Sequence, residues 1–163
     1  MTATDIPQLA TVKSLVRTAA QAELVTRFKR IKQQFKNDGS ILTEADIAMQ
    51  TSLQNAFTAQ WPLIPFLAEE MSAQEQRQLL ANTATGIWVV DPLDGTSNFS
   101  VGIPYYSVSV AFILNGQLEL GVVYDPERDE MFSAQRTVGA FVNDQRLDLS
   151  VMSDVESITI GTV

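Results

Sequence analysis

The chain has 163 residues, of which 45% are hydrophobic and 18% are charged, a composition typical of one folded domain and not of a disordered chain. It contains neither cysteine nor histidine, which excludes disulfides, thiolate zinc sites and any triad or metal centre built on imidazole. Nineteen acidic residues against 11 basic ones give a net charge of −8, which makes nucleic acid and anionic lipid unfavourable partners. Acid–base or metal chemistry must therefore use carboxylates, hydroxyls and water.

The sequence carries no targeting or membrane signal that we can identify. No apolar run approaches the roughly 18 residues that a membrane-spanning helix needs. The first five residues lack the basic start and apolar block of a secretory signal. We therefore expect a cytoplasmic protein with neither a membrane nor a nucleic-acid partner.

The first half of the chain alternates between helical and extended patterns. We expect a helix over residues 8–30, a hairpin whose strands are 31–36 and 41–42, a helix from Thr43 to just before Pro62, a strand over 64–68 and a helix from Ser72 to about Leu80. Apolar positions on one face support the first helix: Val12, Leu15, Val16, Ala19, Ala22, Val25 and Phe28. Ser72 with Glu75 is the pattern of a capping box.

From residue 87 the pattern changes to short strands separated by turns. We expect strands over 87–91, 105–114, 117–124, 130–134, 140–142 and 146–149, with Asn115-Gly116 as a hairpin turn. On the strand over 117–124, the alternation places Leu118 with Leu120, Val122 and Tyr124 on one face. Helices followed by an antiparallel meander indicate an α+β fold with helices packed on a mainly antiparallel sheet. Residues 157–163 read as the start of a further apolar strand, which raises the expectation of a truncated domain.

The segment over residues 88–99 is the part of the sequence most informative about chemistry. A buried strand delivers Asp91 to its end, Pro92 turns the backbone, and Asp94 follows closely enough to share a bound ion. Gly95 permits a left-handed conformation or close approach by a ligand. Thr96 opens a possible helix start, where N–H groups attract phosphate. Carboxylates and an inward carbonyl form an oxygen site suited to Mg²⁺.

Two other interpretations of this segment remain open at the level of its residues. In the first, Asp91 and Asp94 only cap a β-turn that Gly95 allows, which is the better reading of an isolated D-x-x-D-G. In the second, the segment is the nucleophile motif of a haloacid-dehalogenase-like phosphatase. That motif reads D-x-D-G-T, and the spacing here is one residue longer with Pro92 after the first aspartate.

Taken with other segments, the motif resembles the signature of the inositol monophosphatase family of Mg²⁺-dependent, lithium-sensitive phosphatases. The resemblance runs from about residue 12 to residue 150 and rests on an ordered set of segments. These are Lys36 with the turn at 38–39, Thr43 to Asp46, residues 67–70, Asp91 to Thr96 with Trp88 before and Asn98-Phe99 after, residues 121–126 and residues 139–141. It implies the first half of a layered sugar-phosphatase fold and a homodimer.

The resemblance also implies roles for individual residues. Glu69, Asp91 and the main-chain carbonyl of Leu93 correspond to the ligands of a first metal ion, and Asp91 with Asp94 to those of a second. Thr96 and Asp46 correspond to the pair that orients and deprotonates the attacking water. Glu69 and the N–H groups of Gly95 and Thr96 correspond to substrate-binding groups. The complete family site takes two or three Mg²⁺ ions, can use Mn²⁺ and is inhibited by Li⁺.

This chain departs from the family pattern in its length. Family members are considerably longer, and their second half supplies a further aspartate of the second metal site and most contacts to the substrate's organic part. Nothing after Ser150 resembles that half. We expect a small phosphorylated substrate, with inositol monophosphate favoured by residues 97–99 and 124–132. Fructose 1,6-bisphosphate, 3′-phosphoadenosine 5′-phosphate, and a non-catalytic metal-binding or interaction domain remain alternatives.

Overall fold

The computed structural model describes residues 6–28, 33–35, 41–69 and 71–148. The helical elements are α1 (Leu9–Ala20), the π-helical turn η1 (Gln21–Val25), α2 (Glu44–Gln60), α3 (Ala73–Leu80) and α4 (Thr96–Val101). The strands are β1 (Gln33–Phe35), β2 (Ile41–Thr43), β3 (Phe66–Ala68), β4 (Ile87–Asp94), β5 (Ser107–Leu114), β6 (Gln117–Asp125), β7 (Glu130–Gln135), β8 (Gly139–Val142) and β9 (Gln145–Arg146).

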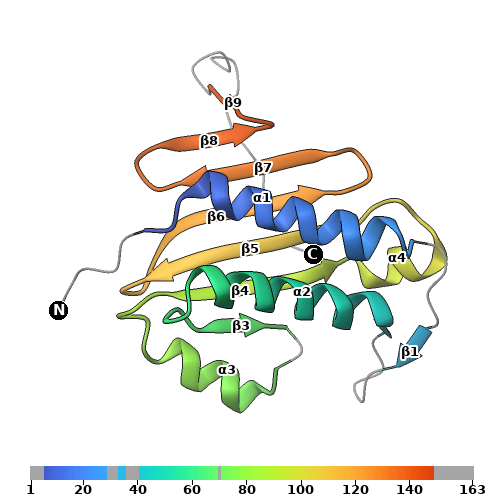
Figure 1. The fold of residues 1–163 in the computed structure, drawn as a ribbon, viewed down its shortest axis with the longest axis horizontal. Helices are drawn as coiled ribbons and strands as arrows, with labels where there is room; N and C mark the ends of the chain where they lie inside the picture. Colours follow the sequence, from blue (N-terminus) through green and yellow to red (C-terminus); the bar gives the residue numbers. More distant parts are fainter. Residues whose placement is uncertain (1–5, 29–32, 36–40, 70, 149–163) are drawn as a thin grey trace, which may run out of the picture.

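A seven-stranded sheet in the order β3-β4-β5-β6-β7-β8-β9 forms the centre of the fold. The β3–β4 pair is parallel and the other neighbours are antiparallel. Figure 1 shows α1 and α2 lying across the same face of this sheet, with α3 beside the edge strand β3. The expected α+β fold, with helices on a mainly antiparallel sheet, is therefore confirmed.

The core lies between these two helices and the sheet. Met49, Leu53 and Phe57 of α2 recur at helical spacing and are all buried. Phe57 meets the fully buried Trp88 of β4 edge to face, with ring centroids 4.7 Å apart. Trp88 in turn lies 4.9 Å from the ring of Phe112 on β5. This aromatic packing anchors β4, the strand that carries the candidate site, against α2.

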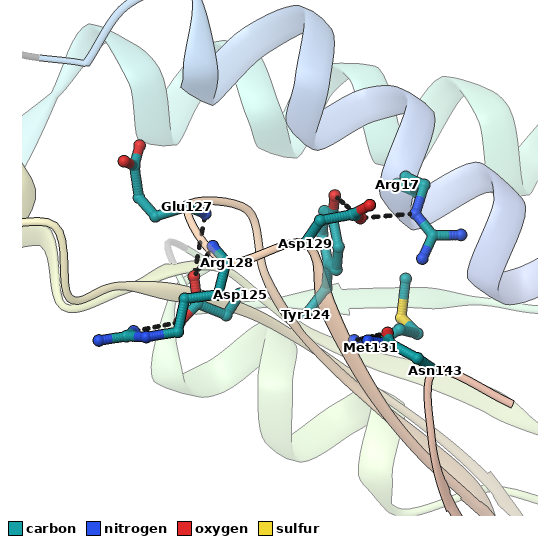
Figure 2. Close-up of polar contacts among 8 residues, drawn as sticks. All are labelled: Arg17, Tyr124, Asp125, Glu127, Arg128, Asp129, Met131 and Asn143. Carbon is teal, nitrogen blue, oxygen red and sulfur yellow. Dashed lines mark hydrogen bonds and ion pairs between the residues drawn. The ribbon is translucent and has the colours of Figure 1, made fainter. Parts of the chain in front are cut away.

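Polar side-chain contacts connect α1 with the hairpin formed by β6 and β7. Figure 2 shows the Asp129 carboxylate between Arg17 of α1 and Tyr124 of β6. Asp129 Oδ1 accepts from Arg17 Nε at 3.0 Å and from the Tyr124 hydroxyl at 2.8 Å. These two donors hold the pKa of Asp129 below its usual value. The contacts therefore fix the position of α1 along the sheet.

The helix expected over residues 8–30 is shorter in the structure and changes its winding. After Ala20 the chain forms the π-helical turn η1, which has more residues per turn than an α-helix. The apolar face is therefore displaced: Leu24 is fully buried, whereas Val25, expected to be buried, is 46% exposed. Ala22, also expected on the apolar face, is exposed.

The alternation expected for Leu118 is also wrong. Phe112 pairs with Leu120, but the next residue, Ile113, pairs with Leu118, so β6 contains an extra residue at this point. Side chains on the two sides of such a bulge no longer alternate in phase. Leu120 is therefore buried under the helices, while Leu118 is 55% exposed and lines a hollow on the opposite face.

Other elements agree with the sequence in kind and differ in their bounds. The hairpin is present as β1 and β2 paired antiparallel, with its turn outside the described residues. The strand expected to end at Asp91 continues to Asp94 through a shift in register, so Pro92 bends β4 without ending it. The Asn115-Gly116 turn has φ values of 52° and 73°, as a tight hairpin requires. Residues 149–163, including the expected last strand, lie outside the described part.

The sheet face opposite α1 and α2 is apolar and hollowed in the described structure. A hollow of about 510 Å³ lies over β4 to β8, and its lining includes Val89, Ala111, Val123, Phe132 and Phe141. Val123 and Phe132 are 42% and 41% exposed, which is high for large apolar side chains in the middle of a sheet. In the part of the chain that the structure describes, no helix is both long and apolar enough to cross a bilayer.

Candidate active site

The candidate site forms where two parallel strands end side by side. Ala68 of β3 pairs with Val90 of β4, so Glu69 and Asp91 follow at the same end of neighbouring strands. The β3–β4 crossover that contains α3 makes this parallel arrangement possible. Asp91 lines the hollow on the open face of the sheet. Parallel pairing of the two strands therefore brings the two carboxylates to the same end of the sheet.

Asp91 lies in an environment that disfavours its negative charge. Partial burial and then the charge of Glu69 raise its pKa to about 6, and the charges of Asp94 and Asp46 contribute in the same direction. One hydrogen bond opposes this shift, because the Leu93 N–H donates to Asp91 Oδ1 at 3.1 Å. That bond is the turn-capping role considered above, and it leaves a partly buried carboxylate crowded by others. A bound cation would relieve this repulsion.

Gly95 makes the sharp connection between β4 and α4. Its φ of 88° and ψ of 31° lie in the left-handed region that glycine adopts without strain. A Cβ atom at this position would lie 2.9 Å from the main-chain oxygen of Tyr105, too close for an ordinary contact. The side-chain amide of Asn98 donates to that same oxygen at 2.9 Å. The glycine and the asparagine together hold the 102–106 loop against the start of α4.

Thr96 opens α4 and faces the first turn of α2. Its Oγ1 lies 3.0 Å from Oδ1 of Asp46 and 2.9 Å from the carbonyl oxygen of Leu93. Asp46 is only 2% exposed, and β2, which leads directly into α2, packs against α4. The two residues that the resemblance assigns to one role are therefore adjacent, although 50 residues separate them in the chain.

A cavity of about 470 Å³ adjoins the site on the side of Asp94 and Gly95. Its remaining wall comes from the 105–107 segment and from the end of the β6–β7 hairpin, including Arg128 and Glu130. Arg128 is paired with Asp125 at 2.6 Å and lies over the ring of Tyr105. The cavity is large enough for a small organic molecule beside Asp94.

The donor set of the site is hard oxygen, but no complete metal cage is formed. Among the described residues, no three Asp or Glu side chains lie close enough to hold one ion together. The carboxylates of Glu69 and Asp91 and the main-chain carbonyl of Leu93 match in kind the oxygen ligands that Mg²⁺ takes. The Leu93 carbonyl accepts from the Thr96 hydroxyl in this structure. Lys36, Asp38 and Glu70 lie outside the described residues.

One contact near the site could not be predicted from the sequence. The side-chain amide of Gln76, in α3, donates to the main chain around Glu69. A glutamine four residues after a helix cap is unremarkable in a sequence, because its partners are main-chain atoms that carry no side-chain pattern.

Comparison with known proteins identifies the family to which this sequence is related. The sequence profile of the inositol monophosphatase family matches residues 1–163. The chain is 36% identical over 127 residues to Nus factor SuhB of Pasteurella multocida, covering 78% of this chain and 46% of that protein. It is 34% identical over 133 residues to inositol-1-monophosphatase of Mesorhizobium japonicum, covering 82% and 48%.

A solved structure gives the same result at the level of the fold. The Thermotoga maritima IMPase TM1415 superposes with a TM-score of 0.75 at 30% identity, over 85% of this chain and 52% of that one. The chain belongs to the inositol monophosphatase family. It spans about half the length of the relatives it matches, and the match covers their N-terminal half.

Proposed function

We propose that this chain provides the metal- and phosphate-binding half of a Mg²⁺-dependent phosphomonoesterase that uses water directly as its nucleophile. The observation that carries the proposal is the place of Asp91 at the strand end, where partial burial and then the charges of Glu69, Asp94 and Asp46 raise its pKa to about 6. Carboxylates held together against their own repulsion are a common feature of cation sites. Family membership supports the same reaction class.

In this proposal Glu69, Asp91 and the carbonyl of Leu93 hold the first cation, and Asp91 with Asp94 contributes to a second. When bound, such ions neutralise phosphate charge and lower the pKa of water, which this chain without histidine needs. Mn²⁺ can replace Mg²⁺ at oxygen ligands of this kind. We also propose inhibition by Li⁺, which rests on the family resemblance alone.

Thr96 and Asp46 act on the nucleophilic water. The single hydrogen of the Thr96 hydroxyl can point to Asp46 or to the Leu93 carbonyl, both within 3.0 Å. When it points to Asp46, a lone pair of Oγ1 remains to accept from water, so the hydroxyl can take a proton from the water while it gives its own hydrogen to Asp46 as the base. Burial of Asp46 keeps this path away from bulk solvent.

The phosphate is held at the start of α4. The N–H groups of Gly95 and Thr96 lie where the chain leaves β4, and Glu69 borders the same place from β3. Free N–H groups at a helix start bind anionic oxygen atoms.

We propose inositol monophosphate as the substrate, with fructose 1,6-bisphosphate and 3′-phosphoadenosine 5′-phosphate as alternatives. A relative named inositol-1-monophosphatase supports the first choice. We further propose that residues 1–163 form one N-terminal α+β domain of the family fold, and that the protein is cytoplasmic and homodimeric. Its partner is then a small phosphorylated molecule and neither a membrane nor a nucleic acid.

A non-catalytic, metal-binding domain is the second candidate. It is favoured by the position of Asp91 at a hollow on the open, apolar face of the sheet. Release of phosphate from inositol 1-phosphate, with and without Mg²⁺, separates the two candidates. The assay should compare the 163-residue chain, its Asp91→Asn variant and the longer Thermotoga maritima IMPase.

Mg²⁺-dependent release by the chain that disappears in Asp91→Asn supports the enzyme. Because about half of the related fold is not matched by this chain, we expect that release to be much slower than for the longer protein. Metal binding without any turnover supports the second candidate. Equal specific activity of the short chain and the longer protein would contradict our assignment of the site.

A further inference from the structure

The helix α3 has an unusual place in the fold. It lies beside the edge strand β3 (Figure 1), and none of its eight residues is buried. Most helices of a small domain are retained because an apolar face packs into the core. Packing of that kind does not explain why α3 forms at this place, whereas its polar contacts can.

One side chain of α3 reaches back to the segment that carries Glu69. Nε2 of Gln76 lies 3.3 Å from the carbonyl oxygen of Ala68, 3.1 Å from that of Glu69 and 3.2 Å from that of Met71. A primary amide has two hydrogens, so these three acceptors share them. Gln76 therefore ties the main chain both before and after the Glu69 side chain.

The strand before this segment lies at the edge of the sheet. Among the strands that the structure describes, β3 pairs with β4 and with no other, so none of them fixes its outer side. The turn after it is closed by a long hydrogen bond of 3.3 Å from the Met71 N–H to the Ala68 carbonyl. The Ala68 N–H faces the sulfur of Met71 at 3.4 Å, a weak acceptor. The amide of Gln76 is a side-chain donor that contacts the main chain of this segment at three positions.

Gln76 is itself held in place by the start of α3. Ser72 and Glu75 form a capping box: the Glu75 N–H donates to Ser72 Oγ at 3.3 Å, and the Ser72 N–H donates to Glu75 Oε2 at 3.0 Å. The Gln76 N–H then donates to the Ser72 carbonyl at 3.0 Å. The first turn of α3 is thereby rigid, and the Gln76 side chain starts from a defined position.

We propose that Gln76 is a positioning residue that holds Glu69 beside Asp91 through the main chain. The inference rests on the proposed function in one respect, namely that Glu69 is a cation ligand. Loss of an outer partner of a ligand typically weakens metal affinity by about 10–100-fold. In this proposal, α3 supports one side of the candidate site because it carries Gln76.

The test uses the 163-residue chain and two measurements. Hydrogen exchange of the Met71 amide, relative to core amides of β4, reports whether the loop is held. Mn²⁺ affinity, by titration calorimetry, reports whether Glu69 is positioned. Gln76→Met removes the donor at similar length, Gln76→Lys restores a donor, and Gln78→Met changes an exposed glutamine of the same helix as control.

We expect Gln76→Met to speed exchange at Met71 and to weaken Mn²⁺ binding at least tenfold, with Gln78→Met unchanged in both. Gln76→Lys should retain the exchange protection. The proposal is overturned if Gln76→Met and Gln78→Met behave alike, if only exchange changes, or if the lysine does not protect. No Mn²⁺ binding by the unaltered chain would instead contradict the proposed function, and exchange would still decide whether Gln76 holds the loop.

Discussion

The hydroxyl of Thr96 lies 3.0 Å from a carboxylate oxygen of Asp46, which is almost completely buried. Asp46 belongs to the first turn of α2, whereas Thr96 opens α4 at the end of β4. The contact therefore joins the helical layer to the strand end that carries Asp91. A buried carboxylate needs a hydrogen-bonding partner, so this pair also stabilises the junction on which the site depends.

Changes to this pair should affect turnover more than metal binding. In a catalytically competent form, we expect Asp46→Asn and Thr96→Ala to lower kcat by about 10²–10⁴-fold, the usual contribution of a general base. Mg²⁺ affinity should change far less. Ser97→Ala, which removes the hydroxyl of the exposed neighbour, is the control and should leave kcat near that of the unaltered protein.

Steady-state phosphate release and calorimetry provide these numbers. Turnover of either variant at the unaltered rate would show that the pair does not act on the nucleophile. A burst of phosphorylated enzyme on rapid quench would contradict direct attack by water.

Divalent cations should bind through Asp91. We expect Mg²⁺ or Mn²⁺ to bind the chain and Asp91→Asn to bind them much more weakly, because the amide loses the negative charge shared between both proposed sites. Titration calorimetry on the two proteins measures this directly. Equal affinities would remove Asp91 from the ligand set.

Without a cation, the stability of the chain should depend on the ionisation of Asp91. Folding raises its pKa from 3.8 to about 6, so the folded state holds the proton more tightly than the unfolded state. The resulting stabilisation is complete below pH 3.8 and is lost as the pH rises through 6. Because Asp91 is only partly buried, we expect a loss of about 1 kcal/mol after allowance for solvent screening.

Asp91→Asn cannot ionise at this position and should escape that loss. Relative to the unaltered chain, the variant should therefore gain stability between pH 4 and pH 7, measured by denaturant unfolding in the presence of a chelator. A constant difference between the two proteins across this range would show that Asp91 has an ordinary pKa.

Gly95→Ala should destabilise the protein more than Gly116→Ala. Both glycines have φ near 80°, so each alanine incurs a cost of about 1–2 kcal/mol for the left-handed conformation. At Gly116 a Cβ atom meets nothing within 4 Å, whereas at Gly95 it lies 2.9 Å from a main-chain oxygen. The difference between the two variants in unfolding free energy therefore measures the cost of the contact with the Tyr105 oxygen. Equal losses of stability in the two variants would show that the 102–106 loop moves away without cost.

The open sheet face should make the chain associate. Phe132 is 41% exposed within the apolar hollow, and a surface of this kind favours contact with other apolar groups. We expect light scattering to detect concentration-dependent association that Phe132→Ser reduces. Leu63→Ser removes a side chain that is 86% exposed away from that hollow and should have little effect. Association that responds equally to both changes would not involve this face.

Much of the fold could be predicted because its local rules agree with its tertiary packing. Met49, Leu53 and Phe57 recur at helical spacing and are buried, and the Ser72–Glu75 box begins α3 as expected. The prediction is wrong for Val25 and Leu118, where a π-helical turn and a β-bulge each change the phase. A π-helical turn or a β-bulge places one extra residue in a helix or strand without any special residue type to mark it. The periodicity of apolar residues in the sequence therefore does not reveal where it occurs.

The sequence by itself determined the kind of chemistry: a chain without cysteine or histidine, with Asp91, Asp94 and Gly95 at the end of one strand, is limited to oxygen ligands and water. Tertiary structure decided which distant groups join them. Parallel pairing of β3 with β4 brings Glu69 beside Asp91, packing of α2 brings Asp46 to Thr96, and α3 adds Gln76. These contacts arise when separate elements pack together, and the free energy of that packing depends on the whole core and not on any local pattern.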